Sequence, residues 1–268
     1  MADQFYTKQK IAKKCWKKLT RRVKIGKYDV ILEPSGGTGS FYNLLPHDKR
    51  IGIDIEPKHK DIIECDFFDY KPDAGKKYIV VGNPPFGKVS STAVKFFNYA
   101  STFSDIIAFI IPRTFKRVSI QNRLSMDFHI IYNYDLPLTP CCFEPKMMAK
   151  CCFQIWKRKK YKREMIILPE KHGDFDFISY GDKDAKGQPT VPKGADFALK
   201  AYGCNCGKIT TDMKRLRPKS WHFISSNIEV KKLIKRFRKL DYSISKDTVR
   251  QDSIGRKELI HLYIGTFG

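Results

Sequence analysis

The sequence predicts an α/β fold with a mostly parallel central sheet, followed by a smaller α+β region towards the C-terminal end. Two observations lead to this prediction. Short apolar, β-rich runs such as 28–32 and 78–82 lead into glycine, proline, amide and acidic residues, as buried strands of parallel sheets do. The chain also has 268 residues, 42% of them hydrophobic, which is enough to bury a full core.

The first predicted element is a helix over residues 8–24. Ile11, Cys15, Leu19 and Val23 recur on one helical face, and basic residues occupy the remainder. Further along, we expect strands at 28–32, 50–55, 78–82, 105–112 and 151–156. A helix is expected at 91–104, and a short one at 121–127.

A basic segment at 157–163 marks a boundary between the two parts of the chain. We therefore divide it into a domain of residues 1–160 and a region of residues 161–268. In the second region we expect strands at 165–168 and 175–180 and a long loop at 181–195, together with an amphipathic helix at 229–240. This mixture is of the kind that a target-recognition region could have.

A glycine-rich loop follows the strand at 28–32. It contains Gly36, Gly37 and Gly39 within four positions, so the backbone can approach a ligand closely. The spacing is not G-x-G-x-x-G, and a dinucleotide pyrophosphate is therefore not the favoured ligand. The alternative is an ordinary loop.

The four residues Asn83, Pro84, Pro85 and Phe86 follow the strand at 78–82. An asparagine side-chain oxygen and a nearby carbonyl offer two acceptors, which suit an exocyclic NH2 group with its two hydrogens. Phe86 offers a flat face on which a planar base can stack. The pattern indicates attack by an aromatic amino nitrogen on an activated methyl group, although N-P-P alone is also ordinary turn chemistry.

Acidic residues occur at two further points. Asp54 ends the strand at 50–55, about where a second strand carries a carboxylate to ribose hydroxyls. Asp66 precedes the aromatic pair Phe67 and Phe68. Since neighbours in a strand alternate faces, one of these two phenylalanines is expected to belong to the core.

Taken together with the opening Asp3-Gln4-Phe5-Tyr6-Thr7, these blocks resemble the S-adenosylmethionine-dependent amino-methyltransferases that modify adenine N6 or cytosine N4 in DNA. The order of cofactor motifs, NPPF motif and C-terminal extension is similar to that of the gamma class. The resemblance covers residues 3 to about 157. It implies a Rossmann-like class I methyltransferase fold, S-adenosylmethionine as cofactor and DNA as the preferred substrate.

The resemblance also implies roles for individual residues. Asn83, Pro84, Pro85 and Phe86 would form the catalytic motif that holds the target base. The cofactor would be bound by Tyr6, Thr7, Glu33, Pro34, Gly36, Gly37, Asp54, Ile55, Asp66 and Phe67. Within this set, the first six residues named would surround the methionine end of the cofactor. Asp54 would accept hydrogen bonds from the ribose hydroxyls, and Ile55 would pack against the adenine. Asp66 would accept from the adenine N6, with Phe67 beside the ring.

The substrate side of the site is less closely defined. The family's second base-stacking aromatic could be Phe143 or Phe153, and the sequence does not decide between them. Arg113 and Lys116 follow the strand at 105–112 and could contact phosphates, or could belong to a solvated basic loop.

Charge is unevenly distributed along the chain, which has a formal net charge of +23. Residues 1–27 hold ten lysines and arginines against a single acid, and residues 151–268 hold 26 against 13. Residues 28–112 hold nine basic against 11 acidic residues. Basic ends around a near-neutral middle suit a polyanion lying across the site, although a generally lysine-rich proteome would also raise the charge.

Other classes are disfavoured by composition. No apolar run approaches the ~18 residues that a membrane span needs, and no secretory signal is evident, so we expect an intracellular protein with reduced cysteines. The eight cysteines lack C-x2-C spacing, and we expect no metal. The sequence leaves the oligomeric state open.

The prediction is therefore an enzyme that methylates the amino group of a nucleic-acid base, with adenine N6 in DNA favoured. One alternative is an adenine N6 methyltransferase acting on RNA, since some ribosomal-RNA methyltransferases carry a sequence resembling 83–87. The other is a nucleic-acid-binding subunit that keeps the fold without turnover.

Overall fold

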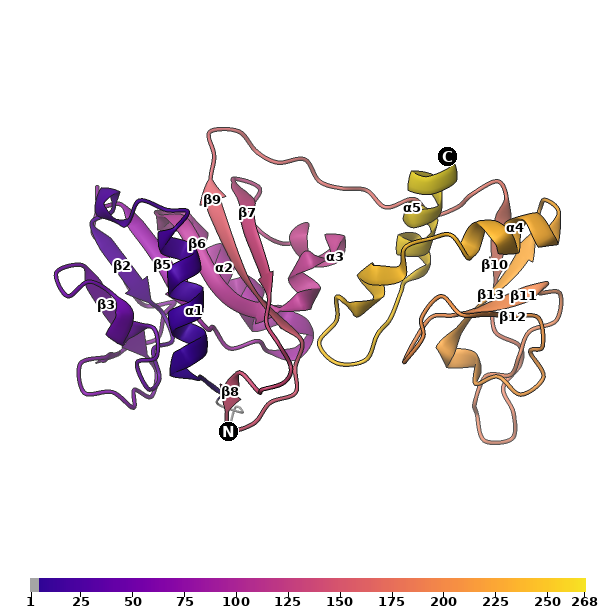
Figure 1. Cartoon of the computed structure of the whole chain (residues 1–268), viewed down its shortest axis with the longest axis horizontal. Coiled ribbons are helices and arrows are strands. Elements are labelled where there is room, and N and C mark those ends of the chain that lie inside the picture. Colours follow the sequence, from indigo (N-terminus) through magenta and orange to yellow (C-terminus); the bar gives the residue numbers. More distant parts are fainter. Residues whose placement is uncertain (1–4) are drawn as a thin grey trace. The chain divides into compact units, whose positions relative to one another are not determined.

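The computed structural model describes residues 5–268, which form two compact units that meet in the chain at Met165 and Ile166. The first unit is built on a seven-stranded sheet, and the second on a four-stranded sheet. Each is described by itself (Figure 1).

The sheet of the first unit has the strand order β4-β3-β2-β5-β6-β9-β7. Five neighbouring strands run parallel, and β9 lies antiparallel to both β6 and β7. The strands are β2 (Val30–Glu33), β3 (Arg50–Asp54), β4 (Ile63–Glu64), β5 (Tyr78–Gly82), β6 (Ser104–Pro112), β7 (Phe128–Asp135) and β9 (Cys151–Arg158). This is the mostly parallel arrangement predicted from the apolar runs, and it agrees with the Rossmann-like fold that the family resemblance implies, so the fold prediction is confirmed.

The two faces of this sheet are covered by different helices (Figure 1). α2 (Ser91–Phe103) packs Ala93, Phe97 and Ala100 into the cluster that contains Val80 and Phe109. α1 (Gln9–Thr20) covers the other face with a buried stripe of Ile11, Ala12, Cys15 and Leu19. The short helix α3 spans Val118–Gln121, and the 3-10 turns of this unit are Ile25–Lys27, Tyr42–Leu44, Lys88–Ser90 and Arg113–Lys116.

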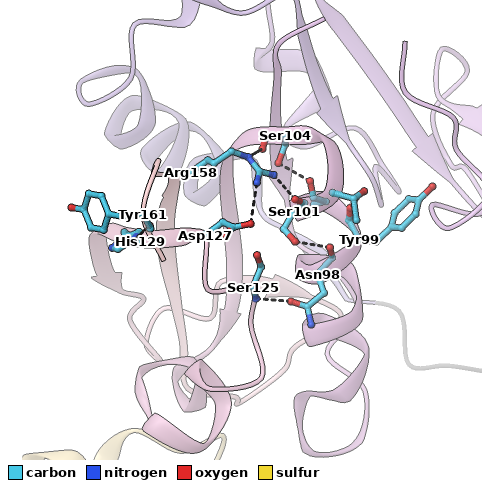
Figure 2. Close-up of polar contacts among 11 residues, drawn as sticks. Asn98, Tyr99, Ser101, Ser104, Ser125, Asp127, His129, Arg158 and Tyr161 are labelled. Atoms are coloured by element: carbon cyan, nitrogen blue, oxygen red, sulfur yellow. Dashed lines mark hydrogen bonds and ion pairs between the residues drawn. The ribbon is translucent and has the colours of Figure 1, made fainter. Parts of the chain in front are cut away.

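The end of α2 is tied to the sheet by polar contacts, which Figure 2 shows. Arg158 of β9 donates to the carbonyl oxygens of Ser101 and Ser104 and lies 3.5 Å from a carboxylate oxygen of Asp127. Asn98 accepts from the backbone N–H of Ser125 at 3.0 Å. The bonds from Arg158 satisfy carbonyls that a helix end leaves without partners, and the Asn98 bond joins the helix to the loop before β7.

The second unit has the antiparallel strand order β10-β13-β11-β12. Its strands are β10 (Phe175–Ile178), β11 (Phe197–Lys200), β12 (Ile209–Thr210) and β13 (Trp221–Ser226). Helices α4 (Val230–Phe237) and α5 (Arg256–Phe267) pack on this sheet through Leu233, Phe237, Leu259 and Tyr263, and 3-10 turns lie at Pro218–Ser220 and Tyr242–Lys246.

Most predicted elements are present, although several differ in extent; the helix expected at 229–240, for example, is confined to Val230–Phe237. The helix expected at 8–24 is shorter, and the one expected at 121–127 lies earlier, at Val118–Gln121. No strand forms at 165–168, where the chain passes from the first unit to the second. Within residues 5–268, no helix is long and apolar enough to cross a membrane.

Candidate functional site

The predicted motifs meet at one edge of the first sheet. Because β2, β3, β4 and β5 run parallel, their carboxyl ends lie together, and these ends carry Glu33, Asp54, Glu64 and Asn83. The chain moves outward in opposite directions from the neighbouring strands β2 and β5. Such a switch point opens a crevice in which open α/β sheets bind ligands.

A small cavity lies at this switch point. It is lined by Phe5, Tyr6, Thr7, Glu33, Ser35, Gly36, Thr38, Ser40, Phe41 and Asn83. These residues come from three separate parts of the sequence, namely the N-terminal segment, the glycine-rich loop and the NPPF motif. The structure therefore brings the first residues of the chain to the same place as the two sequence motifs.

The glycine-rich loop needs glycine for two distinct reasons. Gly37 has a φ of +48°, and a Cβ placed there would lie 2.8 Å from the ring of Tyr6. A Cβ on Gly36 would lie 2.5 Å from Cδ1 of Ile62. The loop is thus packed closely between the N-terminal segment and the β3–β4 side of the sheet.

The N-terminal segment is held over the loop by a short ladder. β1 (Tyr6–Thr7) pairs with β8 (Phe143–Glu144), and Ser40 donates a hydrogen bond of 2.5 Å to the carbonyl oxygen of Thr7. The remaining two residues of that predicted motif, Asp3 and Gln4, lie outside the described residues.

Asn83 has a fixed orientation and one free acceptor. Its side-chain nitrogen donates to the backbone oxygen of Phe5 at 3.1 Å, a bond that only the NH2 end of the amide can make. Its side-chain oxygen is buried and has no hydrogen-bond partner among the described residues, and the same holds for Oγ1 of Thr7. Since a buried polar atom without a partner is costly, both atoms indicate a site that a ligand completes.

Glu33 is a buried carboxyl in the wall of the cavity. It accepts from the backbone N–H of Tyr42 at 2.6 Å and is 2% exposed. Burial raises the pKa of Glu33 well above its usual range, against the effect of the backbone N–H groups of Tyr42 and Phe41, and the charge of Asp54 raises it further. No described lysine, arginine or histidine pairs with it, so its surroundings would favour a positively charged group nearby. Pro34 beside it is buried.

Asp54 holds the glycine-rich loop in place. One carboxylate oxygen accepts from the backbone N–H of Gly37 at 2.8 Å, and the other accepts from that of Glu56 at 2.9 Å. Each oxygen keeps a second lone pair. The neighbouring Ile55 is 68% exposed, which is unusual for an isoleucine directly after a strand and leaves an apolar surface beside the carboxylate.

The structure corrects one cofactor candidate. Phe67 is 1% exposed and packs in the core, with its ring 5.0 Å from those of both Phe96 and Tyr99. A side chain so enclosed has no free face for a ligand ring, and Phe67 is a core residue. Its neighbour Phe68 is 37% exposed, and Asp66 is exposed while accepting from the backbone N–H of Phe68.

The loop after the NPPF motif is strained. Pro84 is buried, Pro85 exposed and Phe86 half-buried. Behind them, Val89 and Ser90 have φ values of 51° and 59°, which residues with a side chain rarely adopt. Strain of this kind is found mostly at ligand-binding and catalytic sites, and it costs about 1–3 kcal/mol for each such residue.

The two candidates for a second base-stacking aromatic have different surroundings. Phe153 lies in the middle of β9, between Ile110 of β6 and Tyr134 of β7, and is 0% exposed. It belongs to the core, and its prediction as a substrate residue is wrong. Phe143 is also buried, but it lies opposite Thr7 in the β1–β8 ladder, at the edge of the site.

The two basic candidates are bound within the unit. Arg113 donates to the backbone oxygen of Leu136 at 3.0 Å and lies 3.6 Å from the carboxylate of Asp135. Lys116 lies 3.3 Å from the same carboxylate. Arg113 therefore joins the end of β6 to β7, and its role as a phosphate contact stays a prediction. Lys116 therefore shares this carboxylate with Arg113, and its role as a phosphate contact also stays a prediction.

Sequence reasoning missed the contribution of Phe5. Its backbone oxygen orients Asn83, and every residue type has such an oxygen, so no sequence signal could have revealed it. Ser35 and Ser40 also line the cavity, and their place in the glycine-rich loop was a usable signal.

Comparisons with known proteins add the following. No protein-family model matches the chain, and no curated protein matches it. Solved structures with a similar fold include the 23S rRNA methyltransferase ErmE, with 17% identity, 60% of this chain and 71% of that chain covered, and a TM-score of 0.41. A Pyrococcus horikoshii protein assigned as an RNA methyltransferase has 17% identity, 59% and 87% coverage and a TM-score of 0.43. A Listeria monocytogenes protein assigned to the class I S-adenosylmethionine-dependent methyltransferases has 15% identity, 61% and 62% coverage and a TM-score of 0.41. At these values the likeness does not decide the function, which is argued from the site.

Proposed function

We propose that the protein transfers a methyl group from S-adenosylmethionine to the exocyclic amino group of a nucleic-acid base, with adenine N6 in DNA as the favoured acceptor. The observation that carries this proposal is the side chain of Asn83. Its nitrogen is bonded to Phe5, and its buried oxygen has no partner among the described residues, so it can only accept from a ligand. An amino group of a base is a donor of the required kind.

The residues around Asn83 account for the chemistry. The lone pair of an aromatic amino nitrogen is delocalised into the ring, which makes it a weak nucleophile. If Asn83 Oδ1 and the carbonyl oxygen of Pro84 accept its two hydrogens, the nitrogen becomes tetrahedral and its lone pair localises. Both acceptors would also stabilise the positive charge that develops on this nitrogen. The S–CH3 bond would break as the N–CH3 bond forms, S-adenosylhomocysteine would leave, and the methylated nitrogen would release one proton to water, so that no strong general base is needed. Phe86 would stack on the base.

The remaining site residues fit the cofactor. S-adenosylmethionine supplies a methyl group bonded to a positively charged sulfur. The buried carboxyl of Glu33 lacks a positive partner among the described residues, and Thr7 Oγ1 lacks a hydrogen-bond partner, so both favour the methionine end of such a molecule. Asp54 would accept from ribose hydroxyls with its remaining lone pairs, Ile55 would cover the adenine, and Asp66 would accept from its amino group.

The choice of DNA follows from the second unit. A region of about a hundred residues beyond the catalytic unit, rich in lysine and arginine, suits recognition of a long nucleic acid. The alternative substrate is RNA, which would be methylated at adenine N6. A silent binding subunit is the other alternative, and the open acceptor of Asn83 beside the cavity argues against it, since a protein without turnover has no need to keep it.

The test is methyl transfer from radiolabelled S-adenosylmethionine to DNA and, separately, to RNA. Products are digested to nucleosides, and the methylated nucleoside is identified by mass spectrometry. Methylated adenine in DNA supports the proposal. Methylated adenine found only in RNA would show that RNA, the alternative, is the substrate. Binding of S-adenosylmethionine with no methyl transfer to either nucleic acid would refute the proposal that the protein is a nucleic-acid methyltransferase.

A further inference from the structure

The exposed face of α1 in the first unit is positively charged, and none of its basic residues belongs to the proposed site. Four basic side chains of α1 lie three and four residues apart and are exposed: Lys10, Lys13, Lys17 and Arg21, the last at the helix end. On a helix this spacing puts them on one face, and we call them the α1 stripe. It lies apart from the buried face of α1 that packs on the sheet.

The α1 stripe is not balanced by acids. Within residues 5–268, the only ion pair that the lysines and arginines of residues 5–27 form is the one between Lys8 and Glu144, at 3.6 Å. No described carboxylate pairs with the α1 stripe. The first turn of α1 contains no acid, and lysines there oppose the helix dipole. Each pair of like charges four residues apart destabilises the helix by about 0.2–0.5 kcal/mol. Stability alone does not account for this arrangement.

A second basic row borders the α1 stripe on one side. The amino group of Lys14 lies 4.8 Å from the ring centre of Tyr134, and that of Lys18 lies 4.0 Å from it. Lys18 also donates to the hydroxyl of Tyr132 at 2.9 Å. These contacts with β7 fix the orientation of α1, so the stripe is presented by a rigid element.

The α1 stripe starts at the candidate site. β1, which lines the cavity, ends one residue before the helix cap at Lys8, and the backbone N–H of Lys8 donates to Cys142 beside β8. From Lys10 to Arg21 the helix advances about 16 Å, at 1.5 Å per residue. One strand of B-DNA carries a phosphate about every 3.4 Å along the axis, so the stripe can face several in succession.

We infer that the α1 stripe binds the sugar–phosphate backbone of the DNA strand that carries the target adenine. This inference rests on the proposed function for its choice of partner. Unbalanced positive charge, a rigid presentation and a start at the site mouth together suit a strand that leads away from the flipped base. The stripe thus supplies part of the energy needed to take that base out of the helical stack, which is a few kcal/mol.

The rival surface is α4 in the second unit, where Lys231, Lys232 and Lys235 are exposed, as is Arg238 at the C-terminal cap of the helix. The adjoining Arg236 does not belong to that set, because it bonds Asp174 at 2.6 Å and the hydroxyl of Tyr263 at 3.0 Å. The four exposed residues match the α1 stripe in composition, three lysines and one arginine, and so provide a control of equal charge.

The experiment compares two quadruple variants of the full chain. One changes Lys10, Lys13, Lys17 and Arg21 to Gln, and the other changes Lys231, Lys232, Lys235 and Arg238 to Gln. Glutamine is a good helix former and removes the repulsion within α1, so both helices should persist. Binding to fluorescently labelled duplex DNA is followed by anisotropy between about 50 and 200 mM salt. Calorimetry of S-adenosylmethionine binding reports whether each variant retains its first unit.

The α1 variant should bind DNA at least ~10-fold more weakly, and its log–log salt slope should flatten by about 0.9 for each phosphate contact removed. Cofactor affinity should match wild type. An unchanged affinity and slope in the α1 variant would overturn the inference, most directly if the α4 variant shows the loss instead. Wild-type protein that binds DNA without methylating it would refute the proposed function. The inference that the α1 stripe binds DNA would still be tested by comparing the two variants. Wild type that binds S-adenosylmethionine but no DNA would overturn both.

Discussion

Replacing Asn83 with alanine separates catalysis from folding, because the two ends of this side chain have different roles. The change removes one hydrogen bond, from Nδ2 to the Phe5 carbonyl at 3.1 Å, worth about 1 kcal/mol. It also removes a buried oxygen that has no partner among the described residues, whose burial costs about 1–3 kcal/mol. The two effects oppose each other, so the free energy of unfolding should lie between its wild-type value and about 2 kcal/mol above it.

Methyl transfer should respond very differently. Loss of one well-placed polar group that stabilises a transition state lowers turnover by about 100-fold or more. We therefore expect Asn83→Ala to reduce single-turnover methyl transfer by at least ~100-fold, while the calorimetric affinity for S-adenosylmethionine stays close to wild type. Thermal unfolding of the same preparation gives the stability change.

Asn98→Ala is the matched control. Its side chain has a partner at each end. It accepts from Ser125 N–H at 3.0 Å, as Figure 2 shows, and donates to the Arg123 carbonyl at 2.8 Å. Its loss should lower the free energy of unfolding by about 1–3 kcal/mol and leave turnover per folded molecule unchanged. An Asn83→Ala variant that is active but unstable, or inactive only because it fails to bind cofactor, would refute the assignment of Asn83.

Three further predictions concern the cofactor and the second unit. Asp54→Ala should weaken S-adenosylmethionine binding at least ~10-fold by calorimetry, because ribose hydroxyls would lose an acceptor and Gly37 its anchor, and removing such partners costs about 1–3 kcal/mol each; unchanged affinity would mean that another group, such as Glu56, holds the ribose. Burial lowers the pKa of His222 from 6.5 to about 4. Because the unfolded chain binds the proton first, the second unit should lose stability as the pH falls from 6.5 to about 4, and His222→Gln should abolish this dependence in pH-dependent unfolding. The hydrogen bond from Tyr263, followed by the charges of His172 and Arg236, lowers the pKa of Asp174. Its stabilisation is therefore complete at neutral pH and lost as the pH falls through that lowered value, and an Asp174→Asn variant that keeps the full acid-induced loss would contradict this.

The first unit could be predicted well because its signals are local. Apolar strands followed at once by Glu33, Asp54 and Asn83 define the carboxyl edge of a parallel sheet, and parallel pairing then brings them together. α1 and α2 follow from their apolar stripes. These features depend on residue type and spacing, which the sequence displays directly.

The errors arise where the tertiary environment decides. Phe67 and Phe68 are chemically the same, and only the packing of Phe67 against Phe96 and Tyr99 makes it core. The ion pair of Arg113 with Asp135, 22 residues away, likewise depends on the fold and has no signal in the local sequence. In the second unit, β11 and β13 are only four and six residues long, and α5 has weak amphipathic character. For this reason the sequence pattern did not predict these three elements.

The pairing of β1 with β8 has a consequence for synthesis of the chain. Tyr6 and Thr7 are made early, but their partners Phe143 and Glu144 emerge from the ribosome only after most of the first unit. The carbonyl that orients Asn83 belongs to the residue just before that strand. A nascent chain that stops short of β8 would thus hold the predicted cofactor motifs and still lack the strand pairing that places Phe5 beside Asn83. The site proposed for methyl transfer would be completed only when β8 has been made.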